Sequence, residues 1–402
     1  MRAWVRGTWR IVGLLVIAAI APLHGAIAKP AVTALRIGEY PTKTRFVIEL
    51  SERASFRAFT LATPYRVVVD LPLVDWRLPE GTARKGGLIT DLRYGQFSNE
   101  TSRIVLDVAT PAEVAKSFLL EPRDGKGHRL VIDIKRIGEA EFRGRKRPRP
   151  VADAAPGRVP APIAKPTRQA GAKKLIAIDP GHGGVDPGAT GISGVHEKSL
   201  MLVQARELQR RLKATGRYHV VLTRSRDVFI QLRERIAIAR RAGADLFISL
   251  HADSIANPKV RGGSIYTLSE HASDKVAAAL AAKENKADMI AGVDLAGQNR
   301  EVANILIHLA QRNSKNESAK FAKILTKELG AEMKLLGRTH RFAGFAVLKA
   351  PDIPSVLIEL GYLSNPVDER NLRRTRHRSK VAQAIVRAVK GYFSRDQAFN
   401  RP

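Results

Sequence analysis

One stretch of the sequence has a composition that does not form a folded core, and it separates the chain into two parts. Residues 138–173 are rich in Pro, Ala and Arg, lack an apolar repeat, and include the run Gly-Arg-Lys-Arg-Pro-Arg-Pro at 144–150. Proline stiffens such a stretch and its like charges repel one another, so the pattern predicts an extended linker. A solvated spacer and an electrostatic tether to an anionic surface are both open interpretations of it. The rest of this 402-residue chain is long enough for two domains of ordinary size.

Upstream of the linker, short runs rich in Val, Ile and Leu recur between Gly, Pro and Ser/Asn turns. These runs are 45–50, 65–70, 102–107 and 129–134. Short strands separated by turn residues are typical of a small sandwich, so we expect an all-β domain over 29–137. No histidines and carboxylates gather here at the spacing of metal ligands, which favours a binding role over a catalytic one.

Downstream of the linker, strand-like and helix-like patterns alternate. We expect strands at 175–179, 220–222, 246–250 and 356–360, and helices around the apolar stripe 201–212, at about 229–242 and at 378–393. This alternation predicts an α/β domain over 174–395, with a mostly parallel sheet flanked by helices on both faces. Functional groups in such folds gather beyond the carboxyl ends of the strands.

The first 28 residues have the pattern of an export signal. Arg2, Arg6 and Arg10 precede the apolar run 11–20, and Ala26-Ile27-Ala28 offers a small-x-small cleavage site. A single membrane anchor is the alternative, but the run is shorter than the ~20 apolar residues that span a bilayer. Since no two arginines are adjacent, we expect the general (Sec) route to the periplasm, with cleavage after Ala28.

The net charge of +30 indicates a partner that is a polyanion. Export makes nucleic acid an unlikely choice, whereas peptidoglycan carboxylates, acidic wall polymers and anionic lipids are all present in a bacterial envelope. The sequence has no cysteine. It therefore has no disulfides, and thiolates are excluded as nucleophiles and metal ligands.

Three candidate metal ligands follow predicted strands or open a predicted helix. His182 lies in Asp-Pro-Gly-His-Gly-Gly, His251 lies in Ser-Leu-His-Ala-Asp, and Glu197 begins the helix after the glycine-rich loop. Two imidazoles and one carboxylate form a catalytic zinc set that leaves the fourth position for water. Taken singly, His182 could be a turn residue, His251 a half-buried histidine that ends a strand, and Glu197 an ordinary acid in the first turn of a helix. The spacing alone also leaves His196 open in place of Glu197.

Glu359 is the candidate acid/base. It lies in the otherwise apolar strand Val356-Leu357-Ile358-Glu359-Leu360, where a carboxylate is costly to bury without a partner. One interpretation is a structural ion pair with an arginine. The other is a general acid/base whose pKa an apolar wall raises.

Four motifs stand in one order along residues 174–395: those at 179–184, 196–198, 249–253, and Ile-Glu-Leu-Gly-Tyr-Leu-Ser-Asn at 358–365. Together they resemble the zinc-dependent N-acetylmuramoyl-L-alanine amidases of the Amidase_3, cell-separation type. The β-rich half resembles the wall-targeting AMIN domain of these enzymes.

This resemblance implies that His182, Glu197 and His251 hold Zn²⁺, and it favours Glu197 over His196. It implies that Glu359 is catalytic. The implied reaction is hydrolysis of the amide between N-acetylmuramic acid and L-alanine in peptidoglycan, in daughter-cell separation and wall turnover. We expect a monomer. A zinc carboxypeptidase acting on wall peptides and a non-catalytic wall-binding scaffold are the alternatives.

A long helical insertion, about 271–318, is expected between strands at 264–266 and 345–348. Its first helix, about 273–290, has an apolar stripe of Val276, Leu280, Ala287 and Ala291 that also contains Glu284. In relatives that this chain resembles, an inserted helix covers the cleft and a glutamate completes the zinc shell. Glu284 is therefore a hypothetical autoinhibitory ligand, and an ordinary surface helix is the alternative.

A second helix of the insertion carries Val302, Ile305, Leu306 and Leu309 at helical spacing. This stripe is either a core face or a docking surface for an activator. The resemblance implies an activator of the LytM type.

Overall fold

The computed structural model describes residues 29–123, 125–144, 172–293 and 305–399, without the side chains of 305–310 and 395–399. The predicted export signal and most of the predicted linker lie outside the described residues, as does Val302 of the second insertion stripe. The start of that linker forms helix α1 (Glu139–Gly144). No helix of the described part is both long and apolar enough to cross a membrane.

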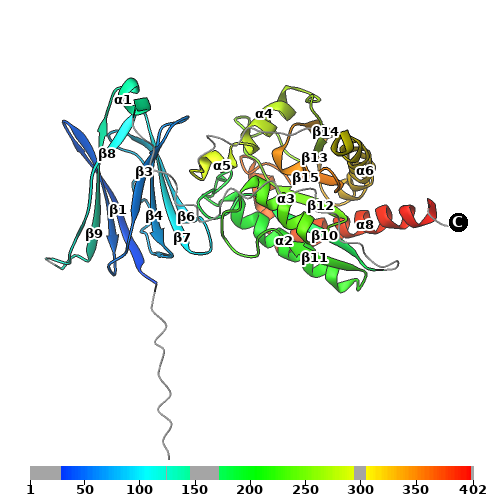
Figure 1. Cartoon of the computed structure of the whole chain (residues 1–402). Helices are drawn as coiled ribbons and strands as arrows, with labels where there is room; N and C mark the ends of the chain where they lie inside the picture. Colours follow the sequence, from blue (N-terminus) through cyan, green and yellow to red (C-terminus); the bar gives the residue numbers. More distant parts are fainter. Residues whose placement is uncertain (1–28, 124, 145–171, 294–304, 400–402) are drawn as a thin grey trace, which may run out of the picture.

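The first domain is a sandwich of two sheets, as predicted (Figure 1). The inner sheet, which faces the second domain, has the order β3-β4-β7-β6; the outer sheet has the order β5-β1-β2-β9-β8. Alternate residues of both sheets, including Phe46, Val69 and Ile104, point inward and form one core. The strands are β1 (Ala31–Tyr40), β2 (Lys43–Leu50), β3 (Arg57–Leu61), β4 (Arg66–Pro72), β5 (Asp75–Trp76), β6 (Ile89–Gln96), β7 (Thr101–Val108), β8 (Ala112–Leu120) and β9 (His128–Arg136).

The second domain contains a mixed sheet of order β11-β10-β12-β15-β13-β14. Strands β11, β10, β12 and β15 run parallel, and β13 is antiparallel to β15 but parallel to β14. The predicted α/β fold with a mostly parallel sheet is confirmed. The strands are β10 (Lys174–Pro180), β11 (Tyr218–Leu222), β12 (Leu246–His251), β13 (Gly263–Leu268), β14 (Leu335–Ala343) and β15 (Ser355–Glu359).

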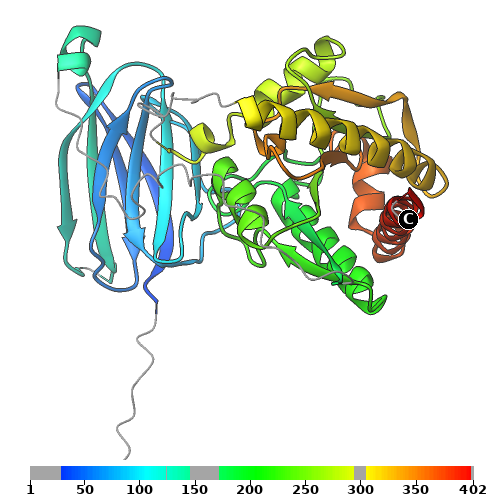
Figure 2. The ribbon, with the colours of Figure 1, turned by 45° about the vertical axis from the view of Figure 1, so that its right-hand side comes forward.

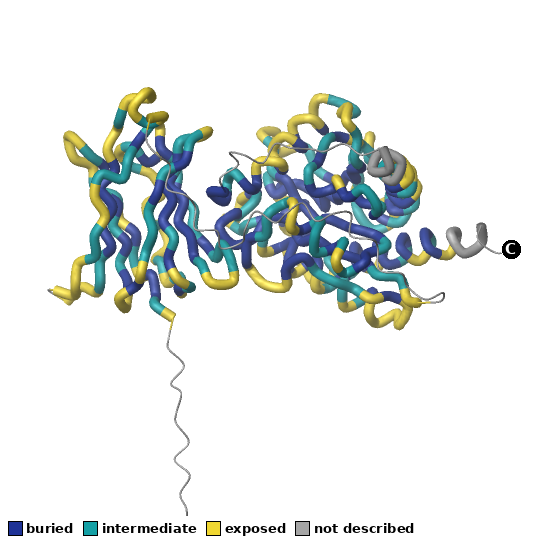
Figure 3. The backbone as a smooth tube through the Cα atoms, in the orientation of Figure 1, coloured by how far each residue is buried: buried dark blue, intermediate teal, exposed yellow. Residues whose placement is uncertain are grey.

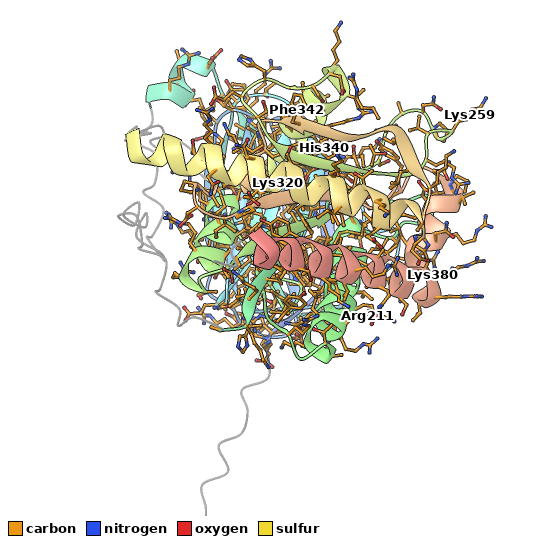
Figure 4. The ribbon with its side chains drawn as sticks, turned by 90° about the vertical axis from the view of Figure 1, so that its right-hand side faces the viewer. Arg211, Lys259, Lys320, His340, Phe342 and Lys380 are labelled. Carbon is orange, nitrogen blue, oxygen red and sulfur yellow. The ribbon has the colours of Figure 1, made fainter. Side chains whose placement is uncertain are left out.

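Helices cover both faces of this sheet. On one face, Ile176 and Ile178 of β10 share a core with α2 (Glu197–Ala214), α6 (Ile305–Gly330) and α8 (Thr375–Phe399). On the other face, Ala177 shares a core with α3 (Leu232–Arg241), α4 (Lys275–Glu284) and the 3₁₀ helix η1 (Ala346–Leu348). Figure 4 views the molecule from the end remote from the sandwich, where α6 and α8 lie side by side and the exposed Lys320 and Lys380 extend outward.

The insertion differs in detail from its prediction. The helix expected over 273–290 is broken into α4 and a short α5 (Ala287–Ile290), and Val276 of the expected apolar stripe is 53% exposed. Asp274 caps α4 by accepting from the backbone N–H of Ala277. The other stripe residues Leu280, Ala287 and Ala291 are buried, and Ala277 and Ala281 are buried with them. The strand expected at 345–348 is wrong, because this segment forms η1 and strand β14 precedes it.

The two domains meet along the inner sheet (Figure 2). The ring of Phe97 stacks on that of Phe229 with centroids 5.9 Å apart, and the backbone N–H of Phe229 donates to the carbonyl of Gln96 at 3.1 Å. Helix α5 lies between the inner sheet and the α/β domain, and two of its residues, Ala287 and Asp288, are buried there (Figure 3). The sandwich therefore contacts the insertion as well as loops of the α/β domain.

Candidate metal centre and active site

The candidate residues gather at one edge of the α/β sheet. Strands β10, β12 and β15 are parallel neighbours, so their carboxyl ends lie together. His182 follows β10, His251 ends β12, and Glu359 ends β15 directly opposite His251 in the strand register. Glu197 is the first residue of α2, which packs over β10. All four side chains are at least 94% buried.

The loop that carries His182 is held by buried arginines. His182 has φ +57°, a left-handed conformation that residues other than glycine rarely adopt. The guanidinium of Arg235 donates to the carbonyl of His182 and to the carboxylate of Asp179, both at 2.9 Å. Arg224 donates to the carbonyl of Gly181 at 2.8 Å. These contacts fix the strained loop in position.

Asp186 orients the His182 ring. Its carboxylate lies 2.9 Å from His182 Nδ1, which leaves Nε2 to face the cluster. A carboxylate on the second ring nitrogen is a recurrent feature of metal-binding histidines, because it fixes the tautomer and increases the basicity of the ligand. Gly188 lies against the same ring: a Cβ on this residue would be 2.5 Å from His182 Cδ2. Only glycine fits this approach.

Glu197 is fixed by backbone donors. Its Oε2 accepts from the N–H of Ala189 at 2.9 Å, and its Oε1 accepts from the N–H of Ala252 at 2.8 Å. Oε2 lies 3.2 Å from His182 Nε2, and Oε1 lies 3.1 Å from His251 Nδ1. The carboxylate therefore lies between both histidines.

One ligand atom from each of His182, Glu197 and His251 lies within 4.8 Å of the other two, so this group could hold a metal ion. Within the described chain, His182 Nε2 and His251 Nδ1 are buried without a hydrogen-bond partner. Such atoms are costly unless something binds them. The donor set of two imidazoles and a carboxylate fits zinc.

The charges of this group are strongly coupled. Burial alone would lower the pKa of His251, but the carboxylates of Glu284 and Glu197 outweigh it and raise that pKa to about 10. For His182 the same competition, with Asp186 the first opposing carboxylate, raises the pKa well above its usual value. Both pKa shifts favour the protonated imidazoles beside these carboxylates. A divalent cation would displace these protons.

Glu359 has one engaged and one free carboxyl oxygen. Its Oε2 accepts from the backbone N–H of Asp253 at 2.9 Å. Its Oε1 is buried and, in the described part of the chain, has no partner. Burial raises the pKa of Glu359 well above its usual value, although the neighbouring His251 opposes the shift. No arginine pairs with Glu359 among the described ion pairs, so the structural ion-pair interpretation finds no support.

The insertion reaches into this cluster. Glu284, at the end of α4, is 6% exposed, and its Oε2 lies 3.4 Å from His182 Nε2 and 3.2 Å from His251 Nδ1. The preceding Lys283 pairs with Asp253, which follows β12. The surface-helix interpretation of α4 is therefore wrong at its C-terminal turn.

A cavity of about 350 Å³ opens beside the cluster. His182, Gly188 and Glu284 line it from the α/β domain. Arg84 and Arg93 line it from the sandwich. The sandwich thus borders a cavity that adjoins the candidate ligands.

The structure brings together the predicted residues His182, Glu197, His251, Glu359 and Glu284. His196 is not among them: it precedes α2 as its N-cap, and its Nδ1 contacts the hydroxyl of Thr190 at 3.2 Å. The sequence analysis missed Asp186 and the buried arginines. Asp186 carried a signal, since a metal-binding histidine usually has a carboxylate partner and Asp186 follows His182 by four residues.

Comparisons with known proteins identify the family of both domains. The family N-acetylmuramoyl-L-alanine amidase (Amidase_3) matches residues 176–391, and the AMIN domain family matches residues 34–134. The chain belongs to the N-acetylmuramoyl-L-alanine amidase family. This family membership confirms the resemblance inferred from the four motifs. It also confirms the enzyme class and the hydrolysis of peptidoglycan.

Relatives match either the whole chain or its second half. N-acetylmuramoyl-L-alanine amidase AmiC of Neisseria meningitidis serogroup B is 36% identical over 398 residues, which cover 94% of this chain and 94% of the relative. AmiC of Escherichia coli O6:H1 is 33% identical and covers 90% of this chain and 89% of the relative. AmiA of Salmonella typhimurium is 40% identical over 56% of this chain and 78% of the relative.

Proposed function

We propose that this amidase cleaves the bond between N-acetylmuramic acid and L-alanine with a zinc ion held by His182, Glu197 and His251. The convergence of these three donors beside Glu359 carries the proposal. Bound zinc would supply Lewis-acid polarisation of the scissile carbonyl and activation of water.

Glu359 is the proposed general acid/base. Its free Oε1 accepts the proton of the attacking water and returns it to the departing L-alanine nitrogen, so that the amide C–N bond breaks without a charged amide leaving group. Two features support this role: the raised pKa, which poises the carboxyl for proton transfer, and the N–H of Asp253, which holds Oε2 in place. Asp186 positions His182 and takes no part in proton transfer.

The place of action is part of the proposal. Residues 1–28 act as a Sec signal, the mature chain works in the periplasm as a monomer, and residues 29–137 target it to peptidoglycan. The basic linker 138–173 joins the domains and contacts anionic wall or lipid. The net charge of +30 supports an anionic target.

Mass analysis of digested muropeptides tests the reaction. Zinc-loaded protein should release intact stem peptides from purified sacculi. Glu359→Gln should keep its zinc and lose about 10²- to 10⁴-fold in rate, whereas Glu270→Gln, on an 82% exposed side chain, should be unchanged. Loss of single amino acids from the stems would instead indicate a carboxypeptidase. Full activity in Glu359→Gln would refute the catalytic role.

We further propose that Glu284 occupies the fourth zinc position and keeps the enzyme inactive until a LytM-type activator withdraws the insertion. The distances from Glu284 to both histidines and the adjacent Lys283–Asp253 pair support this inhibition. Glu284→Gln should raise hydrolysis without an activator. Equal activity in the variant and the parent, with equal zinc content, would refute it.

A further inference from the structure

The two central strands of the inner sheet, β4 and β7, are buried on both of their faces. Along a strand, successive side chains point to opposite faces, so a sheet with one solvated face shows alternating burial. Strand β2 of the outer sheet alternates in this way from Lys43 to Leu50. In β4 and β7 of the inner sheet, by contrast, Val68 and Val105 point away from the sandwich core and are still 0% exposed. Something covers this outward face.

The cover is the insertion immediately after α5. Arg103 of β7 donates to the carbonyls of Gly292 at 2.8 Å and Ala291 at 3.3 Å. Arg66 of β4 donates to the carbonyl of Met289. Carbonyls at the end of a helix have no partner within it, so they are natural acceptors for a cation.

Apolar contacts surround these hydrogen bonds. Val105 packs with Ala291 and Val293 of the insertion and with Val185 and Phe229 of the α/β domain. Gly292 lies so close to the inner sheet that a Cβ would be 3.2 Å from Val105 Cγ2.

Arg103 is held in position before it meets the insertion. Its Nε and one terminal nitrogen donate to the carboxylate of Asp70 at 2.6 and 2.9 Å, across the β4–β7 register. Its guanidinium lies over the ring of Phe97, 3.4 Å from the centroid. The third nitrogen is thereby directed at the insertion, and little side-chain entropy is lost on binding.

The same segment carries the inhibitory glutamate at its other end. We call residues 283–293 the plug segment. Between Glu284 in the cleft and Met289 on the inner sheet lie only four residues, two of them in α5. Asp288 fastens the middle, since its carboxylate accepts from the N–H of Leu232 at 3.0 Å. Because so few residues separate the two ends, a displacement of Met289 from the inner sheet can reach Glu284.

We propose that the sandwich is a second holding point for inhibition: Arg103 and Arg66 bind the end of the plug segment and thereby keep Glu284 in the cleft. This inference rests on the inhibitory role of Glu284 proposed above. The sandwich then acts on catalysis directly, in addition to targeting. Release of the plug segment requires the loss of its contacts with the inner sheet as well as those with the histidines.

Two arginines give a matched test. Arg45 on the outer sheet pairs with Asp133 in the same way as Arg103 pairs with Asp70: across an antiparallel register, with two hydrogen bonds of 2.7 and 2.9 Å. Arg45 contacts nothing in the insertion among its described contacts. Arg103→Ala and Arg45→Ala should disturb the sandwich similarly, but only the first should free the plug segment.

The test uses the zinc-loaded two-domain protein without activator. Because hydrogen bonds from a charged donor are worth on the order of tenfold or more in an equilibrium constant, Arg103→Ala should raise stem-peptide release about tenfold. Tryptic cleavage after the exposed Lys286 should accelerate by a similar factor. Arg45→Ala should match the parent within about twofold in both assays.

Equal rates in Arg103→Ala and Arg45→Ala, or faster cleavage without faster hydrolysis, would overturn the holding role. If Glu284→Gln is active while Arg103→Ala is not, inhibition stands and the second holding point is wrong. If neither is activated, inhibition by Glu284 itself fails. Should Arg103→Ala not fold, Val105→Asp with Val47→Asp as its outer-sheet match gives the same comparison, with the same overturning result.

Discussion

The sandwich and the catalytic cleft both bury carboxylates, but they neutralise them differently. In the sandwich, Asp133 accepts from Arg45 and Lys43, and Arg103 pairs with Asp70. These partners are cations at any physiological pH. In the cleft, Glu197 and Glu284 face two histidines.

This difference distinguishes ion pairs that stabilise a domain from charged groups that can bind a ligand. A guanidinium keeps its charge, so each of these sandwich carboxylates is neutralised by residues of the sandwich itself. The imidazoles carry protons that a metal can displace, and their inward nitrogens have no hydrogen-bond partner within the described chain. The buried histidine nitrogens of the cleft therefore need a bound ligand, whereas the buried carboxylates of the sandwich have their partners within the protein.

The largest expected effect comes from removing an inward-facing nitrogen of the cleft. His182→Ala deletes one of three ligands, so zinc should be lost on gel filtration and stem-peptide release should fall on the order of 10⁴-fold. Zinc is measured by elemental mass spectrometry on the purified protein. His219→Ala, on the exposed edge strand β11, is the control and should keep both. If His182→Ala kept its zinc and its activity, His182 would not be a ligand, and its contacts in the cleft would be structural like the ion pairs of the sandwich.

Most of the fold and the ligand set follow from local pattern, because parallel strands bring their carboxyl ends together whatever their distance in the sequence. His182, His251 and Glu359 were predictable for this reason. The strand expected at 345–348 was wrong, since a short apolar run does not distinguish a strand from a buried turn. Val347 and Leu348 are buried as part of η1.

The contacts of Arg103 were not predictable from the sequence. The sequence of β7 alternates like that of a strand with one solvated face, and this pattern would place Arg103, Val105 and Asp107 in solvent. The carbonyls that Arg103 binds lie 188 and 189 residues further along the chain, and no local pattern reports a contact of that separation. Burial of an outward face becomes visible only when the insertion is folded onto it.

An intermediate effect on zinc affinity is expected from Asp186, the carboxylate that orients His182. Asp186→Asn keeps the shape of the side chain but removes the negative charge on His182 Nδ1, so zinc affinity should fall about 10- to 100-fold. Competition with a fluorescent zinc chelator measures this. Asp227→Asn is the control, because Asp227 also accepts from a backbone N–H of this loop, that of Gly184 at 2.7 Å, but lies on no histidine ring. An equal loss in both variants would show that loop geometry, not charge, sets the affinity.

The smallest effect is expected in the sandwich and depends on pH. Hydrogen bonding from Arg45 lowers the pKa of Asp133 to about 2, against burial and with help from Lys43. The unfolded carboxyl titrates near 3.9. The unfolded chain therefore binds more protons between these values, so the stabilisation is complete above about pH 5 and is lost as the pH falls towards 2. Asp133→Asn should cost about 1–2 kcal/mol at pH 7 and progressively less at pH 3.

Trp76 makes this measurable, because it is the only tryptophan after residue 28 and it packs on the sandwich core. Urea unfolding followed by its fluorescence reports on the sandwich alone. Asp75→Asn is the matched control, since its 3.8 Å contact with Arg77 is half-exposed and should contribute little. A cost for Asp133→Asn that is the same at pH 3 and pH 7 would mean that shape, and not the permanent charge of Arg45, stabilises this pair.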